Sequence, residues 1–347
     1  MTTPTRGIQN QPVTEWFEAN IAGATGPFEF EQITGGHSNL TFKVTDANGA
    51  TFVLRRPPLG SVLATAHDMA REHRIITAVG QTSVPIPRAL GLCEDVSVND
   101  APFYVMNYVE GVVLNNNVVV STSMPDPASR TATAASVVET LALLHQVDPD
   151  DIGLGYLGRK DAYLDRQLKR WSGQWEKSKT RELSSMDQAH ARLTQDKPPQ
   201  RYTGIVHGDY RLGNMLVDPS SGRLAAVLDW ELCTLGDVMA DVGYVLNNWV
   251  QPDDSTAPGS SSNPTAAGGF GTREDLVQQY AELTGFEVSS VNYYRAFQCW
   301  RLAAIVEGVL ARYLNGAMGD DNVDTNIFKV QVETLAGQAL ALLDTLT

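Results

Sequence analysis

The sequence predicts an α+β protein in which a small, strand-rich N-terminal part precedes a larger and mainly helical remainder. Short runs that alternate apolar and polar side chains fill the first ~110 residues, as is typical of strands. Longer segments with apolar residues at helical spacing follow, such as 131–147 and 289–315. With 347 residues, 43% of them hydrophobic, the chain is long enough for about two domains and a sizeable core.

Local signals place the N-terminal elements. Residues 28–33 alternate as a strand, and 40–45 and 50–56 predict a hairpin around Asn48-Gly49, because this pair suits the positive φ of a tight turn. Residues 66–80 have apolar side chains near one face and end at a glycine, which indicates a helix. The apolar run 103–106 predicts a buried strand.

Helical patterns dominate the rest of the chain, at 131–147, 163–182, 273–285, 289–315 and 324–346. Two short apolar runs, 204–206 and 224–228, interrupt them. Residues 251–272 are rich in Pro, Gly and Ser, so we expect a flexible loop or lid that does not pack.

Composition excludes several classes of protein. Twenty-six basic and 40 acidic residues give a net charge of −14, which argues against broad binding to nucleic acid or to an anionic membrane surface. No apolar run of about 18 residues is present, and the N-terminus has no signal core. Three cysteines without a close pair exclude a disulfide scaffold and a zinc–cysteine site. We expect a soluble, cytoplasmic protein. No feature of the sequence sets its oligomeric state.

The segment 207–214, followed by 226–230, carries the chemistry. Phosphoryl transfer from a nucleotide needs a carboxylate to accept the proton of the attacking hydroxyl, and oxygen ligands to hold Mg²⁺. Asp209 has Asn214 five residues later, and Asp229 closes the next strand. This spacing is that of a kinase catalytic loop, with Asp209 as base and with Asn214 and Asp229 as metal ligands.

These motifs resemble those of the aminoglycoside phosphotransferase-like kinases. The resemblance is greatest to the branch whose members are fused to acyl-CoA dehydrogenase modules. It implies a protein-kinase-like two-lobed fold that binds ATP and Mg²⁺ and phosphorylates the hydroxyl of a small molecule. The segments that carry it are 52–58, 66–72, 103–111, 207–214 and 228–237.

The resemblance also assigns domains and further site residues. It implies an N-lobe over 1–108, with a five-stranded sheet and one helix, and a C-lobe over 109–347 with its catalytic loop at 205–230. Glu72 matches the helix carboxylate of the kinase ion pair. Further residues match those that contact the nucleotide: Gly35, Gly36, His37, Ser38 and Asn39 in the phosphate-covering loop, and Asn107 and Tyr108 at the hinge that meets adenine.

One position departs from the kinase pattern. The third strand of kinases carries a lysine that binds phosphate, but the segment 52–55 puts Arg55 there. Arginine can hold phosphate bidentately, although its geometry differs from that of lysine. Three interpretations stay open: Arg55 binds the phosphates, Lys43 on the preceding strand does so, or the protein is a weak or inactive enzyme.

Several motifs also have a purely structural interpretation. Glu72 alone could be a solvated charge, and the turn 35–39 could be a plain hairpin. Asp241 is expected to bond backbone amides of the catalytic loop rather than a metal, and His207 to brace that loop. The Gly153–Gly158 sequence fits GxGxxG, but a helix precedes it where a dinucleotide site needs a strand.

The acceptor is the least defined part of the prediction. The branch resemblance favours a hydroxyacyl thioester-like metabolite over an aminoglycoside. A catalytically weak or inactive nucleotide-binding scaffold is the alternative, suggested by Arg55. A protein kinase is disfavoured because no Ala-Pro-Glu segment follows Asp229. Four residues at helical spacings form either ordinary packing with solvated charge or a wall of the acceptor site: Trp171, Trp175, Arg166 and Arg170.

Overall fold

The computed structural model describes residues 5–33, 39–60, 67–251, 254, 260–317 and 323–346. Its contacts divide the chain into two compact units. The first comprises Met1–Gly111 with Ala225–Glu231, and the second comprises Val112–Leu224 with Leu232–Thr347. The short segment that carries Asp229 therefore belongs to the first unit, although more than a hundred residues separate the two in sequence.

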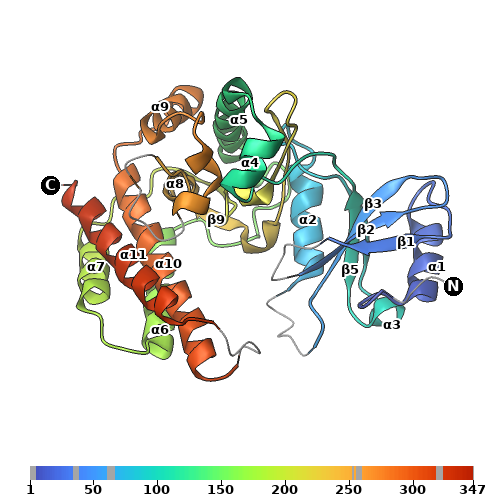
Figure 1. Ribbon diagram of the computed structural model, residues 1–347, viewed down its shortest axis with the longest axis horizontal. Helices are drawn as coiled ribbons and strands as arrows, with labels where there is room; N and C mark the ends of the chain where they lie inside the picture. The colour runs from blue at the N-terminus through green and yellow to red at the C-terminus, as the bar shows by residue number, and fades with distance from the viewer. Residues whose placement is uncertain are drawn as a thin grey trace. The chain divides into compact units, whose positions relative to one another are not determined.

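A five-stranded antiparallel sheet forms the centre of the first unit (Figure 1). Its strands lie in the order β1-β2-β3-β5-β4. The hairpin predicted at 40–45 and 50–56 is confirmed, and so is the strand at 103–106. The strands are β1 (Glu29–Gln32), β2 (Leu40–Thr45), β3 (Thr51–Arg56), β4 (Ala89–Cys93) and β5 (Phe103–Asn107).

The β2–β3 turn follows from its residue types. Asp46 Oδ1 accepts hydrogen bonds from the amides of Asn48 (2.9 Å) and Ala50 (2.8 Å). Gly49 takes a φ of 81°, a conformation that glycine adopts without strain. The register that results pairs Thr41 with Arg55.

Helices cover both faces of this sheet: α1 (Asn10–Asn20) and α2 (Met69–Val79) lie on opposite sides in Figure 1, and a short α3 spans Val96–Asn99. Phe17 of α1 packs with Phe42, Leu54 and other buried residues in one core. Because side chains alternate along a strand, Arg55 points to the opposite face from Leu54, which is the face of α2. The sequence predicted α2 but neither α1 nor α3.

The second unit is mainly helical. Helix α10 contacts α6, α7, α8 and α11, and a two-stranded antiparallel sheet joins β6 to β9. The helices are α4 (Asn117–Ser123), α5 (Pro127–Gln146), α6 (Tyr163–Ser178), α7 (Ser184–Gln195), α8 (Met239–Asn247), α9 (Arg273–Thr284), α10 (Val291–Leu314) and α11 (Asn326–Asp344). The strands are β6 (Thr203–Val206), β7 (Met215–Val217), β8 (Leu224–Val227, whose last three residues belong to the first unit) and β9 (Thr234–Asp237).

The structure corrects one expectation about the Pro/Gly/Ser-rich tract. Residues 260–272 pack instead of forming a free loop: Phe270 is 2% exposed, and its ring meets the Trp249 ring edge-on at 5.7 Å. The Arg130 guanidinium donates to the carbonyl of Ala267 at 2.7 Å. Backbone carbonyls and one aromatic anchor thus order a segment of low average hydrophobicity. Residues 252–253 and 255–259 of the tract lie outside the described residues.

No helix in the described part of the chain has the length and apolar character needed to cross a membrane.

Candidate active site

Arg55 lies at the centre of a buried charge cluster in the first unit. Its Nε is 3.3 Å from Glu72 Oε1, and its Nη2 is 2.5 Å from Asp229 Oδ1. A third carboxylate, that of Glu231, lies 3.9 Å from Nη2. The predicted pairing of Arg55 with Glu72 is therefore present, and Asp229 joins it. One guanidinium faces three carboxylates, which leaves the cluster with an excess of negative charge.

Burial and charge shape the pKa values of this cluster. Glu72 is 2% exposed; burial raises its pKa to about 6, and Arg55 opposes that rise. Burial alone would lower the pKa of Arg55, but the coulombic field of Glu72, Asp229 and Glu231 raises it further above its usual value. Arg55 therefore stays charged and serves as the local counter-ion of the carboxylates.

Asp229 occupies a tight turn after β8. Its φ is 65°, a left-handed conformation that non-glycine residues rarely take and that Asp and Asn tolerate best. The indole of Trp230 donates to the Val227 carbonyl at 3.1 Å, and the Val227 amide donates to Pro85 at 2.8 Å. These bonds fix the turn on the first unit and orient the Asp229 carboxylate toward Arg55.

The segment before β2 joins the same cluster. Asn39 Nδ2 donates to Glu231 Oε2 at 3.2 Å, and Asn39 Oδ1 lies 2.8 Å from His67 Nδ1. Asn39 is the one predicted phosphate-covering residue that the structure describes; the other four lie outside the described residues: Gly35, Gly36, His37 and Ser38.

Lys43, the other candidate for phosphate binding, lies on the same face of the sheet as Arg55 but has different contacts. Its ammonium lies 4.7 Å from the centre of the Tyr108 ring. Asn107, predicted at the hinge with Tyr108, ends β5; its amide N–H already donates to the Arg88 carbonyl at 3.0 Å. The residue that pairs with Glu72 is thus Arg55 and not Lys43.

The second unit holds the 207–214 loop by its backbone. The amides of His207 (2.6 Å) and Gly208 (2.9 Å) donate to the two carboxylate oxygens of Asp241 on α8. His207 Nδ1 in turn accepts from the amide of Asp209 at 3.2 Å. Both structural roles predicted for Asp241 and His207 are confirmed. A φ of 86° and the nearby carbonyl of Leu232 require glycine at position 208.

Three side chains orient the Asp209 carboxylate. Asn214 Nδ2 donates to Oδ2 at 2.6 Å, while Arg211 Nε (3.2 Å) and the Tyr244 hydroxyl donate to Oδ1. The structure therefore brings Asp209 and Asn214 together as the spacing predicted. Burial and the Asp209 charge raise the pKa of Tyr244, so its phenol remains a hydrogen-bond donor at neutral pH.

Aromatic rings and cations lie next to Tyr244, which bonds the Asp209 carboxylate. The Arg301 guanidinium lies 5.9 Å from the centre of the Tyr244 ring and 5.4 Å from that of Trp171, and it approaches the Gly208 carbonyl at 3.4 Å. Trp171 also stacks with Arg170 at 5.2 Å. Trp171 thus packs between two arginines, which is the structural interpretation given above.

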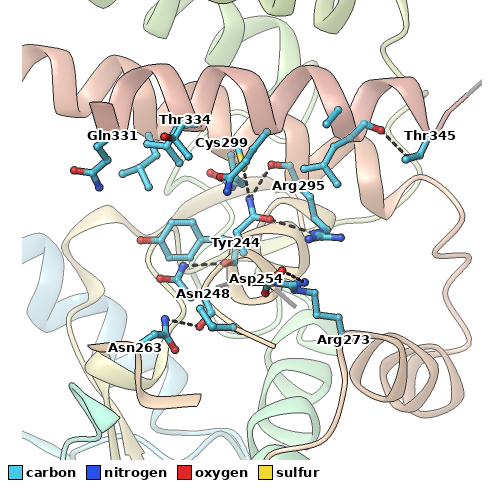
Figure 2. Close-up of a pocket in the computed structure, with 18 residues that line it drawn as sticks. Tyr244, Asn248, Asp254, Asn263, Arg273, Arg295, Cys299, Gln331, Thr334 and Thr345 are labelled. Carbon is cyan, nitrogen blue, oxygen red and sulfur yellow. Dashed lines mark hydrogen bonds and ion pairs between the residues drawn. The ribbon is translucent and has the colours of Figure 1, made fainter. Parts of the chain in front are cut away.

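A cavity of about 470 Å³ lies next to Tyr244 in the second unit, between α8, α10 and α11 (Figure 2). Its size is typical of small-molecule sites. Tyr244 both lines the cavity and bonds the Asp209 carboxylate. A molecule bound in the cavity would therefore lie next to a side chain that orients Asp209.

Each unit by itself offers oxygen atoms of the kind that Mg²⁺ binds. In the second unit, Asn214 uses its amide nitrogen on Asp209, which leaves the amide oxygen for a cation. In the first unit, Asp229 offers a carboxylate in a negatively charged cluster. Within the described residues, no group of three or more His, Cys, Asp or Glu side chains could hold a metal by itself.

Sequence reasoning missed Arg211, Tyr244 and Arg301. Tyr244 follows Asp241 by three residues on α8, so helical spacing could have placed the two on one face. Arg211, two residues after Asp209, was visible in the loop. Arg301 comes from a distant helix, and no local signal points to it.

Comparisons with known proteins agree with this geometry. A family model described as the phosphotransferase enzyme family matches residues 29–283. A mouse protein, acyl-CoA dehydrogenase family member 10, is 35% identical over 299 residues; the match covers 84% of this chain and 27% of the mouse protein. The chain therefore spans about a quarter of that relative.

Solved structures give the same fold. The structure of a candidate aminoglycoside phosphotransferase from Ralstonia eutropha JMP134 has a TM-score of 0.81 and 33% identity, covering 96% of this chain and 98% of that one. An amicoumacin kinase solved with AMP-PNP and Ca²⁺ has a TM-score of 0.59 and 14% identity, covering 97% and 94%. The fold is protein-kinase-like, as predicted. The chain belongs to the phosphotransferase enzyme family.

Proposed function

We propose that this protein transfers the γ-phosphate of ATP to a hydroxyl group of a small molecule. The observation that carries the proposal is Asp209, whose carboxylate is oriented by Asn214 and Tyr244 on a loop that Asp241 holds by its amides. A carboxylate fixed in this way is prepared to accept a proton, and family membership supports phosphoryl transfer as the reaction.

Asp209 would orient the acceptor hydroxyl and accept its proton as the new O–P bond forms. The bond between the γ-phosphorus and the bridging oxygen breaks, and ADP leaves with the electron pair. Asn214, through its amide oxygen, is one proposed magnesium ligand, and Asp229 is the other. Bound MgATP supplies the phosphoryl group and a metal that neutralises charge on it.

Arg55 would bind the nucleotide phosphates, with Glu72 holding its guanidinium in place. Gly35, Gly36, His37 and Ser38 are proposed to cover the phosphates. Asn107 and Tyr108 are proposed to meet the adenine, by backbone groups other than the Asn107 N–H, which Arg88 already occupies. The amicoumacin kinase solved with AMP-PNP and Ca²⁺ supports a nucleotide with a divalent cation as cofactor.

For the acceptor we propose the alcohol group of a hydroxyacyl thioester-like metabolite in preference to an aminoglycoside. Support comes from the mouse relative, whose name places it among the acyl-CoA dehydrogenases. We expect the protein to act in the cytoplasm, where MgATP is abundant. The three cysteines, all buried, are free thiols in the structure.

A second candidate function rests on a specific observation. The Arg55 guanidinium bonds Asp229, so the proposed phosphate ligand and the proposed metal ligand occupy each other. An inactive or weak kinase-like protein that binds nucleotide, or serves as a scaffold, would preserve such a pair. The active phosphotransferase would transfer phosphate to an acceptor with repeated turnover, whereas the inactive or weak protein would bind nucleotide with little or no transfer.

The test is a transfer assay with γ-labelled ATP, Mg²⁺ and a panel of hydroxyacyl thioesters, aminoglycosides, amino alcohols and sugars, with products identified by mass spectrometry. We expect phosphorylation of a hydroxyacyl thioester, lost in Asp209→Asn and retained in the control Asp187→Asn, which changes an exposed carboxylate on α7. Phosphorylation of aminoglycosides alone would reject the proposed acceptor. Nucleotide binding without transfer to any acceptor would favour the scaffold, and an active Asp209→Asn would reject the base.

A further inference from the structure

The cavity beside Tyr244 is lined by few charged residues, and more of them are basic than acidic. Only three charged residues line it in the described part of the chain: Asp254, Arg273 and Arg295. The remainder are amides, hydroxyls, apolar side chains and the Cys299 thiol. Burial raises the pKa of Cys299 to about 12, so the thiol is neutral and adds no negative charge. The cavity carries one more positive charge than negative charge, in a chain whose net charge is −14.

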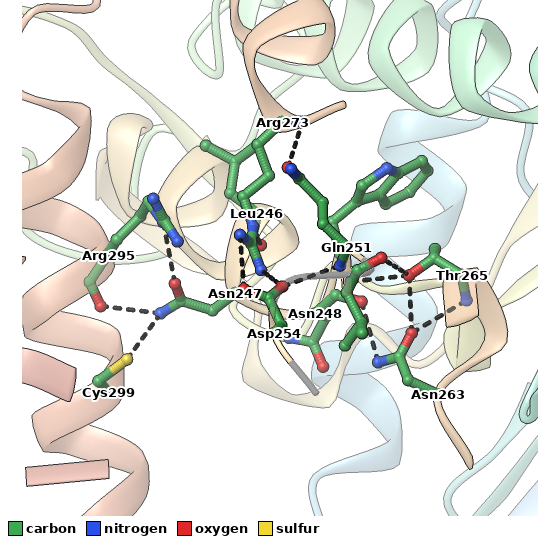
Figure 3. Close-up of polar contacts among 12 residues, drawn as sticks. Leu246, Asn247, Asn248, Gln251, Asp254, Asn263, Thr265, Arg273, Arg295 and Cys299 are labelled. Carbon is green, nitrogen blue, oxygen red and sulfur yellow. Dashed lines mark hydrogen bonds and ion pairs between the residues drawn. The ribbon is translucent and has the colours of Figure 1, made fainter. Parts of the chain in front are cut away.

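Two of these charges cancel each other. Arg273 Nη1 lies 3.2 Å from Asp254 Oδ1, and its Nη2 binds the other carboxylate oxygen. Its Nε donates to the Leu246 carbonyl at 2.9 Å (Figure 3). Burial opposes ionisation of Asp254, but the Arg273 guanidinium outweighs it and lowers the pKa of that carboxyl. The charge of Arg273 is therefore paired with that of Asp254.

Arg295, on α10, has no such counter-ion. Its partners among the described residues are neutral amide oxygens: Asn247 Oδ1 at 3.2 Å from Nε and Asn292 Oδ1 at 3.3 Å from Nη1. Burial and the nearby Arg273 charge lower the pKa of Arg295, while the Asp254 and Glu274 carboxylates, which form no ion pair with it, oppose this shift. Arg295 is thus a partly buried guanidinium that lines a cavity and has neutral amide oxygens, but no carboxylate, as direct partners among the described residues. Such a buried charge is stabilised by an anionic partner.

We propose that the cavity binds an acceptor molecule that carries an oxyanion, either a carboxylate or a phosphate, and that Arg295 holds this group. The planar guanidinium fork binds both kinds of oxyanion bidentately. The inference rests on the proposed function, because it assigns the cavity to the acceptor. It also gives a physical reason against a polycationic acceptor, whose ammonium groups would face Arg295.

The positions of the polar groups indicate an elongated ligand. Asn247, which contacts Arg295, lies three residues after Tyr244 on α8, a rise of about 4.5 Å along the helix. In Figure 2 the Tyr244 hydroxyl and the Arg295 guanidinium point to different sides of the cavity. The acceptor hydroxyl would lie at the Tyr244 end, beside Asp209, and the oxyanion at the Arg295 end.

Binding of short probes without nucleotide tests the inference. The probes are ω-hydroxy carboxylates of increasing length, ω-hydroxyalkyl phosphates, α,ω-diols and ω-amino alcohols, titrated into the full chain by calorimetry up to millimolar concentrations. We expect one of the anionic series to bind about tenfold or more tightly than the diol of equal length, because charge-assisted bonds to arginine are strong. The tighter anionic series identifies carboxylate or phosphate as the group recognised.

Three variants and a control assign the effect to Arg295. Arg295→Gln should abolish the preference for anions, and Arg295→Lys should restore part of it. Asn292→Asp should also weaken the preference, because it gives Arg295 a carboxylate partner with little change in shape. Arg312→Gln removes an exposed charge from the same helix and should change nothing.

Four results would overturn the inference. Diols could bind as tightly as the anionic probes, or amino alcohols could bind more tightly. The preference for anions could survive both Arg295→Gln and Asn292→Asp, or no anionic probe could bind at all. These titrations contain no ATP, so a failure of phosphoryl transfer would leave their result intact. Transfer to a neutral alcohol with no preference for anions would uphold the proposed function and reject this inference.

Discussion

Arg55 and Lys43 offer a matched comparison for locating the phosphate-binding side chain. Both lie on one face of the first unit's sheet, and each is the only basic residue that its strand carries on that face. Arg55 sits 3.3 Å from Glu72 and 2.5 Å from Asp229, whereas Lys43 stacks on Tyr108. We predict that Arg55→Ala weakens binding of MgATP far more than Lys43→Ala does.

The magnitude follows from the bonds lost. A hydrogen bond to a charged group contributes about 1.5–3 kcal/mol, so removal of the guanidinium should raise the dissociation constant of MgATP about 10- to 100-fold. Loss of a cation–π contact at an exposed site costs about 0.5–1 kcal/mol. Lys43→Ala should therefore change the dissociation constant of MgATP by less than about fivefold.

Folding must be separated from binding in this experiment. Removal of one partner of a buried ion pair costs about 3–5 kcal/mol because it leaves the other charge uncompensated. Glu72, 2% exposed, would be that charge. The variant Arg55→Ala should therefore be measured together with Arg55→Ala/Glu72→Gln, by displacement of a fluorescent ATP analogue. A larger loss of affinity in Lys43→Ala than in the double variant would refute the assignment.

Three further predictions concern the reaction and the charge cluster. Asp209→Asn should lower kcat about 100- to 10,000-fold, as expected for a lost general base, while titration shows ATP affinity nearly unchanged. Tyr244→Phe removes one bond to Asp209 and should lower kcat about tenfold with the KM for ATP unaltered in steady-state kinetics; wild-type kcat would show that the bond does not position the base. Burial raises the pKa of Glu72 from 4.5 to about 6, so its contribution to stability is present below pH 4.5 and is lost as the pH rises through about 6. The unfolding free energy of the wild type relative to Glu72→Gln should therefore fall by about 2 kcal/mol between about pH 4 and pH 7 in urea titrations, and a constant difference would contradict the shift.

Sequence reasoning worked best where a signal is local or a motif sets the spacing. The 40–56 hairpin depends on its own turn residues, so its presence could be predicted from Asp46 to Gly49 alone. The association of Asp209 with Asn214 also followed, because five residues separate them in one loop. The Arg55–Glu72 pair needed the family resemblance as well, because nothing in a lone helical glutamate distinguishes a buried charge from a solvated one.

Features that depend on packing between distant segments could not be predicted. Helix α1 has no strong N-terminal signal, and Phe17 becomes a core residue only against Phe42 and Leu54 of the sheet. The segment 260–272 looked unable to pack because its few anchors, such as Phe270, act through partners elsewhere in the chain. Arg295 carries no motif, and its significance lies in the neutral groups that surround it in the structure.

Thermal unfolding with MgATP tests the nucleotide site most directly, because it needs no knowledge of the acceptor. Ligand at about 100 times its dissociation constant stabilises the folded state by about 2.7 kcal/mol, which should raise the Tm by about 4 °C if the chain unfolds as one unit. We expect this rise with MgATP, and its loss with EDTA and in Asp229→Asn, whose side chain also tolerates the positive φ at that position. An unchanged Tm with MgATP would contradict the account, and so would a rise that persists in Asp229→Asn.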